Sequence, residues 1–301
     1  MNQSVKLLKH LTDVNGVAGY EMQVKEAMRN YIEPVSDQII EDNLGGIFGK
    51  KNAENGQYSI MISGHMDEVG FMVTKIDKHG FISFTPVGGW WNQVMLSQKV
   101  TITTDSGKEI RGIIGSKPPH VLTPEERKKP MEIKNMFIDI GVSSKGEAEE
   151  AGVEVGNMVT PYSEFEVLAN NKYLTAKAFD NRYGCALAIE VLQRLKDENI
   201  GINLYSGATV QEEVGLRKHI KDVAKKHNIE VQWDTTPGGG TDAGSIHVAN
   251  EGIPTMTIGV TLRYMHSNVS VLNVDDYENS IRLVTEIVRS LNDETYKNIM
   301  W

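Results

Sequence analysis

The chain has 301 residues, of which 40% are hydrophobic and 24% are charged, so it can bury the core of one large domain or two smaller ones. Lys and Arg total 31 against 40 Asp and Glu, which gives a net charge of −9. This balance argues against a dedicated nucleic-acid-binding protein, because such a protein carries a basic face.

The chain contains one cysteine, Cys185, so an intrachain disulfide is excluded and a reducing compartment fits. Cys185 lies in the apolar run 185–189, which favours a packed core thiol over a nucleophile. The first residues lack the basic and apolar regions of a signal peptide, and no segment is apolar for long enough to cross a bilayer. We therefore expect a cytoplasmic protein without a membrane partner.

Hydrophobic spacing predicts the first elements of the chain. Helices are expected at residues 4–12 and about 21–33, where apolar side chains recur at helical intervals. Short strands are expected near 38–41 and 47–50. The near-continuous apolar run 59–63 is typical of a strand covered on both faces.

The pattern changes between about residues 72 and 165. Short alternating strands are expected there at 81–85, 99–103, 110–114 and 136–140. One helix interrupts them, because Ser144 and Glu147 have the spacing of a capping box. We interpret 72–165 as a small β-rich domain, inserted into a larger domain made of residues 1–71 and 166–301.

The rest of the chain alternates between helices and strands. Helices are expected at 179–196, 216–226 and 275–291, and strands at 202–208 and 254–258. This alternation predicts an α/β fold, in which a mainly parallel sheet is sandwiched by helices.

Metal-type ligands follow several of the expected strands. The candidates are His65, Asp67, Asp180, Glu212, Glu213, Asp242 and His266. Sites in open α/β sheets gather beyond the carboxyl ends of strands, and carboxylates with histidine are the ligands of zinc, cobalt or manganese hydrolases. Each residue alone also fits a plain structural role, as a surface histidine or as an acidic residue at a helix start.

The adjacent carboxylates of Glu212 and Glu213 repel each other unless a positive charge lies nearby. A metal would supply that charge, with one glutamate as ligand and its neighbour as base; a solvated helix start is the alternative. His65 and Asp67 point to the same side of an extended segment, so Asp67 could accept a hydrogen bond from the imidazole and fix its tautomer.

Five segments together form a specific pattern. They are residues 64–70 (GHMDEVG), 178–182 (AFDNR), 211–215 (QEEVG), 238–244 (GGGTDAG) and 264–267 (YMHS). In this order they closely resemble the tetrahedral and glutamyl aminopeptidase family, some of whose members were once labelled cellulases. The resemblance runs nearly from end to end and includes residues 16–21 and 117–120.

The resemblance implies a site with two divalent metal ions per subunit, zinc or cobalt, with manganese as a further option. His65 would bind one ion, Asp180 would bridge both, and Glu213 and His266 would complete the other. Glu212 would be the general base, and Asp67 would orient His65. The inserted β domain would mediate dimerisation, and dimers would assemble into a hollow dodecamer.

One departure from the family pattern follows the two glutamates. The family has another Asp ligand in a strand before the glycine-rich loop, whereas here Arg217 runs directly into Lys218. Asp234 aligns beside that loop, so it is not taken as the ligand. Either a segment is omitted here or the chain lacks half of one metal site. We favour omission, because losing core strands would leave strand edges uncovered. Omission predicts that the two Cα atoms lie farther apart than the roughly 3.8 Å of a trans linkage.

The sequence therefore predicts an aminopeptidase that hydrolyses the N-terminal residue of a peptide through a metal-activated water. Two other classes stay open. A glycosidase would need two carboxylates roughly 5–10 Å apart and no metal. If the segment is truly absent, a non-enzymatic component of an oligomer is the third possibility.

Overall fold

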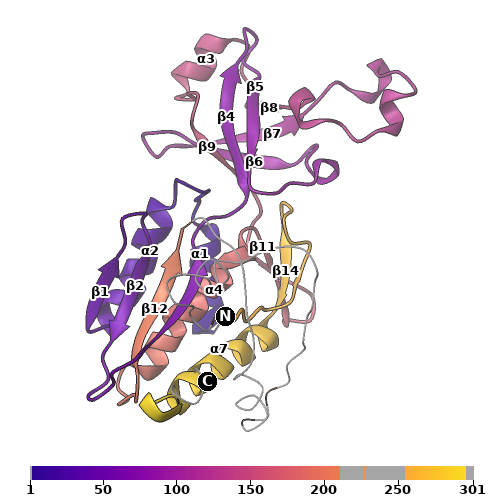
Figure 1. Cartoon of the computed structure of the whole chain (residues 1–301). Helices are drawn as coiled ribbons and strands as arrows, with labels where there is room; N and C mark the ends of the chain where they lie inside the picture. The colour runs from indigo at the N-terminus through magenta and orange to yellow at the C-terminus, as the bar shows by residue number, and fades with distance from the viewer. Residues whose placement is uncertain (1, 211–226, 228, 230–254, 296–301) are drawn as a thin grey trace.

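The computed structural model describes residues 2–210, 227, 229 and 255–295 (Figure 1). Figure 1 shows a β-barrel at the top and a larger α/β part below it. The helices expected in these ranges form as α1 (Gln3–Asp13), α2 (Met22–Ile32), α4 (Phe179–Leu195) and α7 (Val274–Ser290). None of the helices in the described ranges is both long and apolar enough to span a membrane.

The main sheet of the α/β part has four described strands. Their order is β1 (Gln38–Glu41), β2 (Ile47–Lys51), β12 (Asn203–Thr209) and β3 (Ser59–His65). The β12–β3 pair is parallel, whereas β1–β2 and β2–β12 are antiparallel. The α/β class is thus confirmed. The described part of the sheet is mixed rather than mainly parallel, because the β1–β2 hairpin adds antiparallel strands beside β12.

A second, antiparallel sheet has the order β10 (Glu166–Val167), β11 (Tyr173–Ala176), β14 (Ser270–Asn273) and β13 (Leu262–Arg263). The prediction of a strand at 254–258 is wrong over the described residues 255–258, which do not form a strand. Met256 and Ile258 instead pack against a buried cluster that includes Leu283 and Ile287 of α7. Their apolar pattern therefore reflects packing on a helix.

Helix α4 lies in the core and contacts α1, α2, α7, β3 and β12. Its Cys185 is fully buried, and burial raises the pKa of the thiol to about 12, which confirms a packed core thiol. The backbones of β3 and α4 touch at Gly64, where a Cβ atom would lie 2.6 Å from the Cys185 nitrogen. This close approach brings the end of β3 beside the start of α4.

The remaining strands close into an antiparallel barrel. Its order is β4 (Gly70–Ile76), β5 (Ile82–Val87), β8 (Phe137–Asp139), β7 (Glu109–Gly115), β6 (Lys99–Thr103) and β9 (Met158–Pro161). Helix α3 (Lys145–Glu150) precedes β9 and has the expected cap, because the Ser144 side chain accepts a hydrogen bond from the Glu147 backbone N–H. The barrel strands end at Gly70 and Pro161, near the expected boundaries of 72 and 165.

Hydrogen bonds join the barrel to the segment after α1. The Asn15 side chain donates to Glu109 Oε1 at 2.8 Å and accepts from the Thr160 hydroxyl at 2.9 Å. The Tyr20 hydroxyl donates to the Gly156 carbonyl at 2.7 Å. The barrel is thus attached beside the segment that precedes α2.

Candidate active site

Four of the expected site residues come together from separate segments of the α/β part. His65 ends β3 and Asp67 follows it, Asp180 lies at the start of α4, and His266 lies between β13 and β14. All four line one pocket of about 200 Å³. The pocket therefore lies at the carboxyl end of a parallel strand, where α/β sheets place their sites.

The Asp180 carboxylate lies between two imidazoles. Its Oδ1 is 3.5 Å from His65 Nε2, and its Oδ2 is 3.5 Å from His266 Nε2. His65 Nδ1 faces the opposite way, 3.2 Å from Asp67 Oδ1 and 3.1 Å from the Asp67 carbonyl oxygen. Because a carbonyl oxygen only accepts, Nδ1 carries a proton, and Nε2 is the nitrogen directed at Asp180.

The charges of these groups depend on one another. Burial lowers the pKa of His65, but the carboxylates of Asp180 and Asp67 outweigh it and raise this pKa to about 9. Burial raises the pKa of Asp180, but His266 and His65 hold it well below its usual value. The buried carboxylate thus favours a cation beside it, either an imidazolium or a metal ion.

Two residues of the site have backbones that non-glycine residues rarely adopt. Ala178, which precedes α4, has φ 55°, and His266 has φ 57°. Such left-handed conformations cost roughly 1–3 kcal/mol each and cluster at functional sites. Both turns help to direct Asp180 and His266 into the pocket.

The rest of the expected site falls outside the described residues. This applies to Glu212, Glu213, Asp234, Asp242, the glycine-rich segment 238–244, the helix expected at 216–226 and the Cα separation at Arg217–Lys218. Within the described ranges, no group of three or more His, Cys, Asp or Glu residues is arranged to hold a metal ion. Two imidazoles around one carboxylate are nevertheless the donor types that zinc and cobalt accept.

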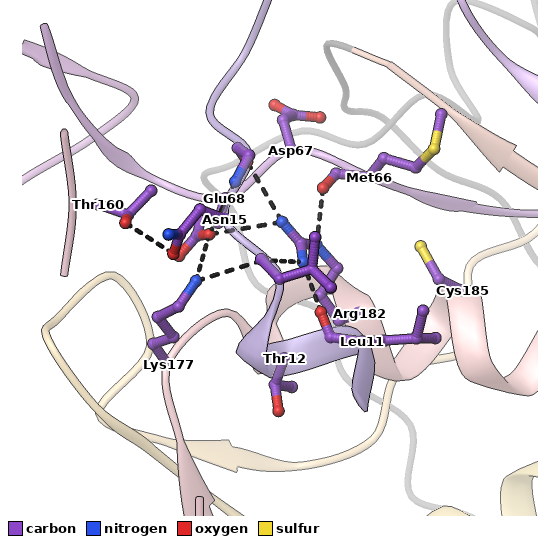
Figure 2. Close-up of polar contacts among 12 residues, drawn as sticks. Leu11, Thr12, Asn15, Met66, Asp67, Glu68, Thr160, Lys177, Arg182 and Cys185 are labelled. Atoms are coloured by element: carbon purple, nitrogen blue, oxygen red, sulfur yellow. Dashed lines mark hydrogen bonds and ion pairs between the residues drawn. The ribbon is translucent and has the colours of Figure 1, made fainter. Parts of the chain in front are cut away.

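Sequence reasoning assigned no role to three charged residues next to the site: Glu68, Lys177 and Arg182. Their side chains are buried, and Lys177 and Arg182 both contact Glu68 (Figure 2). Glu68 and Arg182 belong to the segments 64–70 and 178–182, and charged residues within such motifs were a signal that could have revealed them. Lys177 precedes its motif and gave no such signal.

A second, more apolar pocket of about 780 Å³ shares Gly89, His266 and Ser267 with the first. Its other lining residues are Trp90, Trp91, Val94, Gln98, Tyr264, Met265, Asn268 and Val269. The site at His266 thus opens toward an aromatic surface on which Trp91 and Tyr264 are exposed.

The profile of the M42 glutamyl aminopeptidase family matches residues 45–217 and 215–283. The glutamyl aminopeptidase of Lactococcus lactis subsp. cremoris is 33% identical over 352 positions, covering 97% of this chain and 98% of that protein. The TET aminopeptidase from Thaumarchaeota archaeon SCGC AB-539-E09 is 36% identical, with a TM-score of 0.93 and 99% of each chain covered. The Pyrococcus horikoshii TET1 peptidase is 26% identical, with a TM-score of 0.84, and 96% of this chain and 100% of that chain are covered.

These matches also bear on the segment after Arg217. The 352 aligned positions exceed the 301 residues of the chain by 51, so at least that many have no counterpart here. The family match breaks into two parts that meet at residues 215–217. The sequence runs from Arg217 into Lys218 without interruption, and the Cα separation that would test the expected omission lies outside the described residues, so this expectation stays a prediction. The sequence as it stands lacks the segment.

The missing segment does not obscure the relationship. The family profile matches more than half of the chain, and the Lactococcus lactis relative aligns with nearly all of it. The solved TET aminopeptidase shares its fold along almost the whole length. This protein therefore belongs to the M42 glutamyl aminopeptidase family.

Proposed function

We propose that this chain is a metal-dependent aminopeptidase that removes single residues from the N-termini of peptides. Family membership supports aminopeptidase activity and hydrolase chemistry. One observation in the structure carries the proposal: the Asp180 carboxylate directs one oxygen at His65 and the other at His266. A carboxylate in that position can bridge two cations.

The donor set fits two divalent metal ions, zinc or cobalt, with manganese as a further option. His65 would hold one ion, Asp180 would bridge both, and His266 with Glu213 would hold the other. When bound, the ions would lower the pKa of a water and polarise the scissile carbonyl. Asp67 would keep the proton of His65 on Nδ1, which leaves the lone pair of Nε2 available toward Asp180.

Glu212 would act as the general base, taking a proton from the water and returning one to the leaving amine. Thr209, at the end of β12, is the register partner of His65 on β3. Glu212 follows Thr209 by three residues, which span at most about 11 Å of extended chain. Chain connectivity therefore supports a role for Glu212 near His65.

The peptide would enter beside His266, with side chains reaching the aromatic pocket. We propose that the barrel mediates dimerisation and that dimers assemble into a dodecamer in the cytoplasm. The Pyrococcus horikoshii TET1 peptidase, which can assemble into a tetrahedron or a large octahedral shell, supports an oligomer of this kind.

The proposal is tested with Glu212→Gln. This variant should keep its metal, because the change leaves His65, Asp180 and His266 intact, and it should lose turnover of aminoacyl amides. Normal turnover by Glu212→Gln would refute the role of Glu212 as base. A panel of aminoacyl amides with added zinc, cobalt or manganese would identify the preferred residue and metal. Hydrolysis of a glucan that continues after chelation would support a glycosidase instead.

The missing segment favours a second candidate function. Since the family's additional Asp ligand lies in that segment, one metal ion would lack a ligand, and the chain could serve as a catalytically impaired component of an oligomer. Metal content per chain separates the candidates. Two ions bound with measurable turnover would support the aminopeptidase, whereas one or none without turnover would support the impaired component.

A further inference from the structure

Two of the segments that carry expected metal ligands, those of His65 and Asp180, are joined beside the pocket by three buried charged residues. Glu68 follows Asp67, and Lys177 and Arg182 flank Asp180 in the chain. Their side chains are 1%, 6% and 0% exposed, respectively. Figure 2 shows these side chains converging from different parts of the ribbon. We name Glu68, Lys177 and Arg182 the ion cluster.

Arg182 connects three parts of the chain through backbone carbonyl groups. Its Nε donates to the Met66 carbonyl at 2.7 Å, and its Nη1 donates to Leu11 and Val14 at 2.5 and 2.8 Å. Its Nη2 reaches the Gly16 carbonyl at 3.3 Å. The carbonyls at the end of α1 lack helical partners, and Met66 lies between His65 and Asp67. Arg182 thus fixes α1 and the His65–Asp67 segment relative to the helix that carries Asp180.

Glu68 adds an electrostatic link between the same segments. Its Oε1 is 2.5 Å from Lys177 Nζ and 3.4 Å from Arg182 Nη2. The same oxygen accepts from the Gly16 backbone N–H at 3.2 Å. Because Lys177 and Arg182 lie on either side of Asp180, one carboxylate holds both flanks of the turn that presents Asp180.

Stability alone is a weak reason for such a cluster. The free energy needed to remove two charges from water is about as large as the attraction gained between them when they are buried as a pair. Well-packed apolar residues therefore often stabilise a core as well as a buried ion pair does. The cluster also contains two cations and only one anion. Hydrogen bonds between charged groups, however, restrict the orientation and separation of the two side chains more narrowly than apolar contacts do. A positioning role therefore explains these residues better than a contribution to the core does.

We propose that Glu68, Lys177 and Arg182 are positioning residues, which hold His65 and Asp180 at the separation that metal binding requires. This inference rests on the proposed metal-dependent function. It differs from that function in assigning a task to residues that are not expected metal ligands; Glu68 lines the pocket, whereas Lys177 and Arg182 do not. Partners behind metal ligands commonly affect metal affinity about 10- to 100-fold.

The test uses the intact protein with Glu68→Gln and Lys177→Met. Both variants keep the approximate side-chain size and remove one charge of the cluster. Lys172→Met is the matched control, because Lys172 pairs with Asp275 at 2.5 Å on the surface, with 61% of its side chain exposed. Zinc affinity is measured by competition with a chelator, the fold by far-UV circular dichroism, and kcat and KM separately with one aminoacyl amide.

We expect both cluster variants to keep the native spectrum and to bind zinc about tenfold or more weakly than the control. At saturating zinc, kcat should fall in both variants, and in Lys177→Met KM should stay within about twofold, because Lys177 does not line the pocket. Zinc binding by the variants equal to that of the control would refute the inference and leave the proposed function standing. Loss of the native spectrum in both variants would also refute it, because the cluster would then hold the whole fold. Absence of zinc, cobalt and manganese binding in the unaltered protein would overturn the proposed function itself.

Discussion

The barrel and the α/β part bury their cores in different ways. The barrel closes around its own cluster, which includes Phe71, Ile102 and Ile138, and its strands pair within residues 70–161. The main sheet of the α/β part instead places β12 between β2 and β3, although these strands are about 150 residues apart in the chain. The site depends on this long-range assembly, since His65, Asp180 and His266 come from distant segments. A missing segment after residue 217 therefore bears on the α/β part and leaves the barrel sequence complete.

The largest expected effect is at Gly64, where β3 and α4 touch. Gly64→Ala would place a Cβ atom 2.6 Å from backbone atoms of Gly184 and Cys185, which are unable to move independently of α4. We expect a loss of about 3 kcal/mol in the free energy of unfolding, as for severe overpacking. Zinc binding should also weaken, because His65 and Asp180 would move apart. Denaturant unfolding and a chelator titration measure the two effects, and unchanged values for both would contradict the close packing of β3 on α4.

How much of this could be predicted from sequence differs between the two parts. In the barrel, β5, β6, β7 and β8 lie where the local pattern predicts strands, whereas β4 and β9 were not predicted. Three of the barrel pairs, β5–β8, β6–β9 and β4–β9, join strands that are not consecutive in the chain, and the local pattern does not specify them. In the α/β part the described long helices and the strands of the main sheet were predictable, whereas the four strands of the second sheet were not predicted. The pairing of β2 with β12 was also not predictable, because periodicity does not specify a distant partner. The segment 254–258 illustrates a further limit: packing on a helix and pairing in a sheet give the same apolar pattern.

The site also contains residues that the sequence predicted and residues that it did not. His65, Asp67, Asp180 and His266 could be proposed because they follow apolar strands in a recognisable order. The left-handed conformation of Ala178 had no local signal, since neither glycine nor asparagine occupies that position. The roles of Lys177 and Arg182 were hidden, because a charged residue in a sequence is most often on the surface and only the fold reveals its burial.

The next effect concerns the junction between the two parts. Asn15→Leu would remove the hydrogen bonds to Glu109 and Thr160, and would leave the buried Thr160 hydroxyl without its partner. Leaving such a group unsatisfied costs roughly 1–3 kcal/mol, so we expect a loss of about 2 kcal/mol. If the junction couples the parts, the variant should unfold in two separated calorimetric transitions. A single transition with unchanged midpoint would show that Asn15 does not couple them.

A smaller effect distinguishes the two cores. Ile102→Val in the barrel and Ile189→Val on α4 each remove one methylene from a fully buried side chain. Each should lower the free energy of unfolding by about 1 kcal/mol. Only Ile189→Val should alter zinc affinity, because α4 carries Asp180 whereas the barrel core contributes no expected ligand. Equal changes in zinc affinity would show that the barrel and the site are more tightly coupled than their separate cores indicate.

The smallest expected effect is a gain in stability at Gly146, in the first turn of α3 on the barrel. A Cβ atom there would meet nothing closer than the Ser144 hydroxyl oxygen at 3.9 Å, and alanine has the higher helix propensity. Gly146→Ala should therefore raise the free energy of unfolding by about 0.5 kcal/mol. Gly152→Ala is the matched control: Gly152 has φ 102°, which alanine adopts only with strain, so this change should lower stability by about 1 kcal/mol. Thermal unfolding measures the stability of both variants, and a chelator titration measures their zinc affinity. A more stable Gly146→Ala and a less stable Gly152→Ala would show that the barrel responds to local backbone preference. Unchanged zinc affinity in both would show that the site, which is set by contacts between distant segments, does not. Destabilisation by both substitutions would mean instead that packing around α3 outweighs local preference.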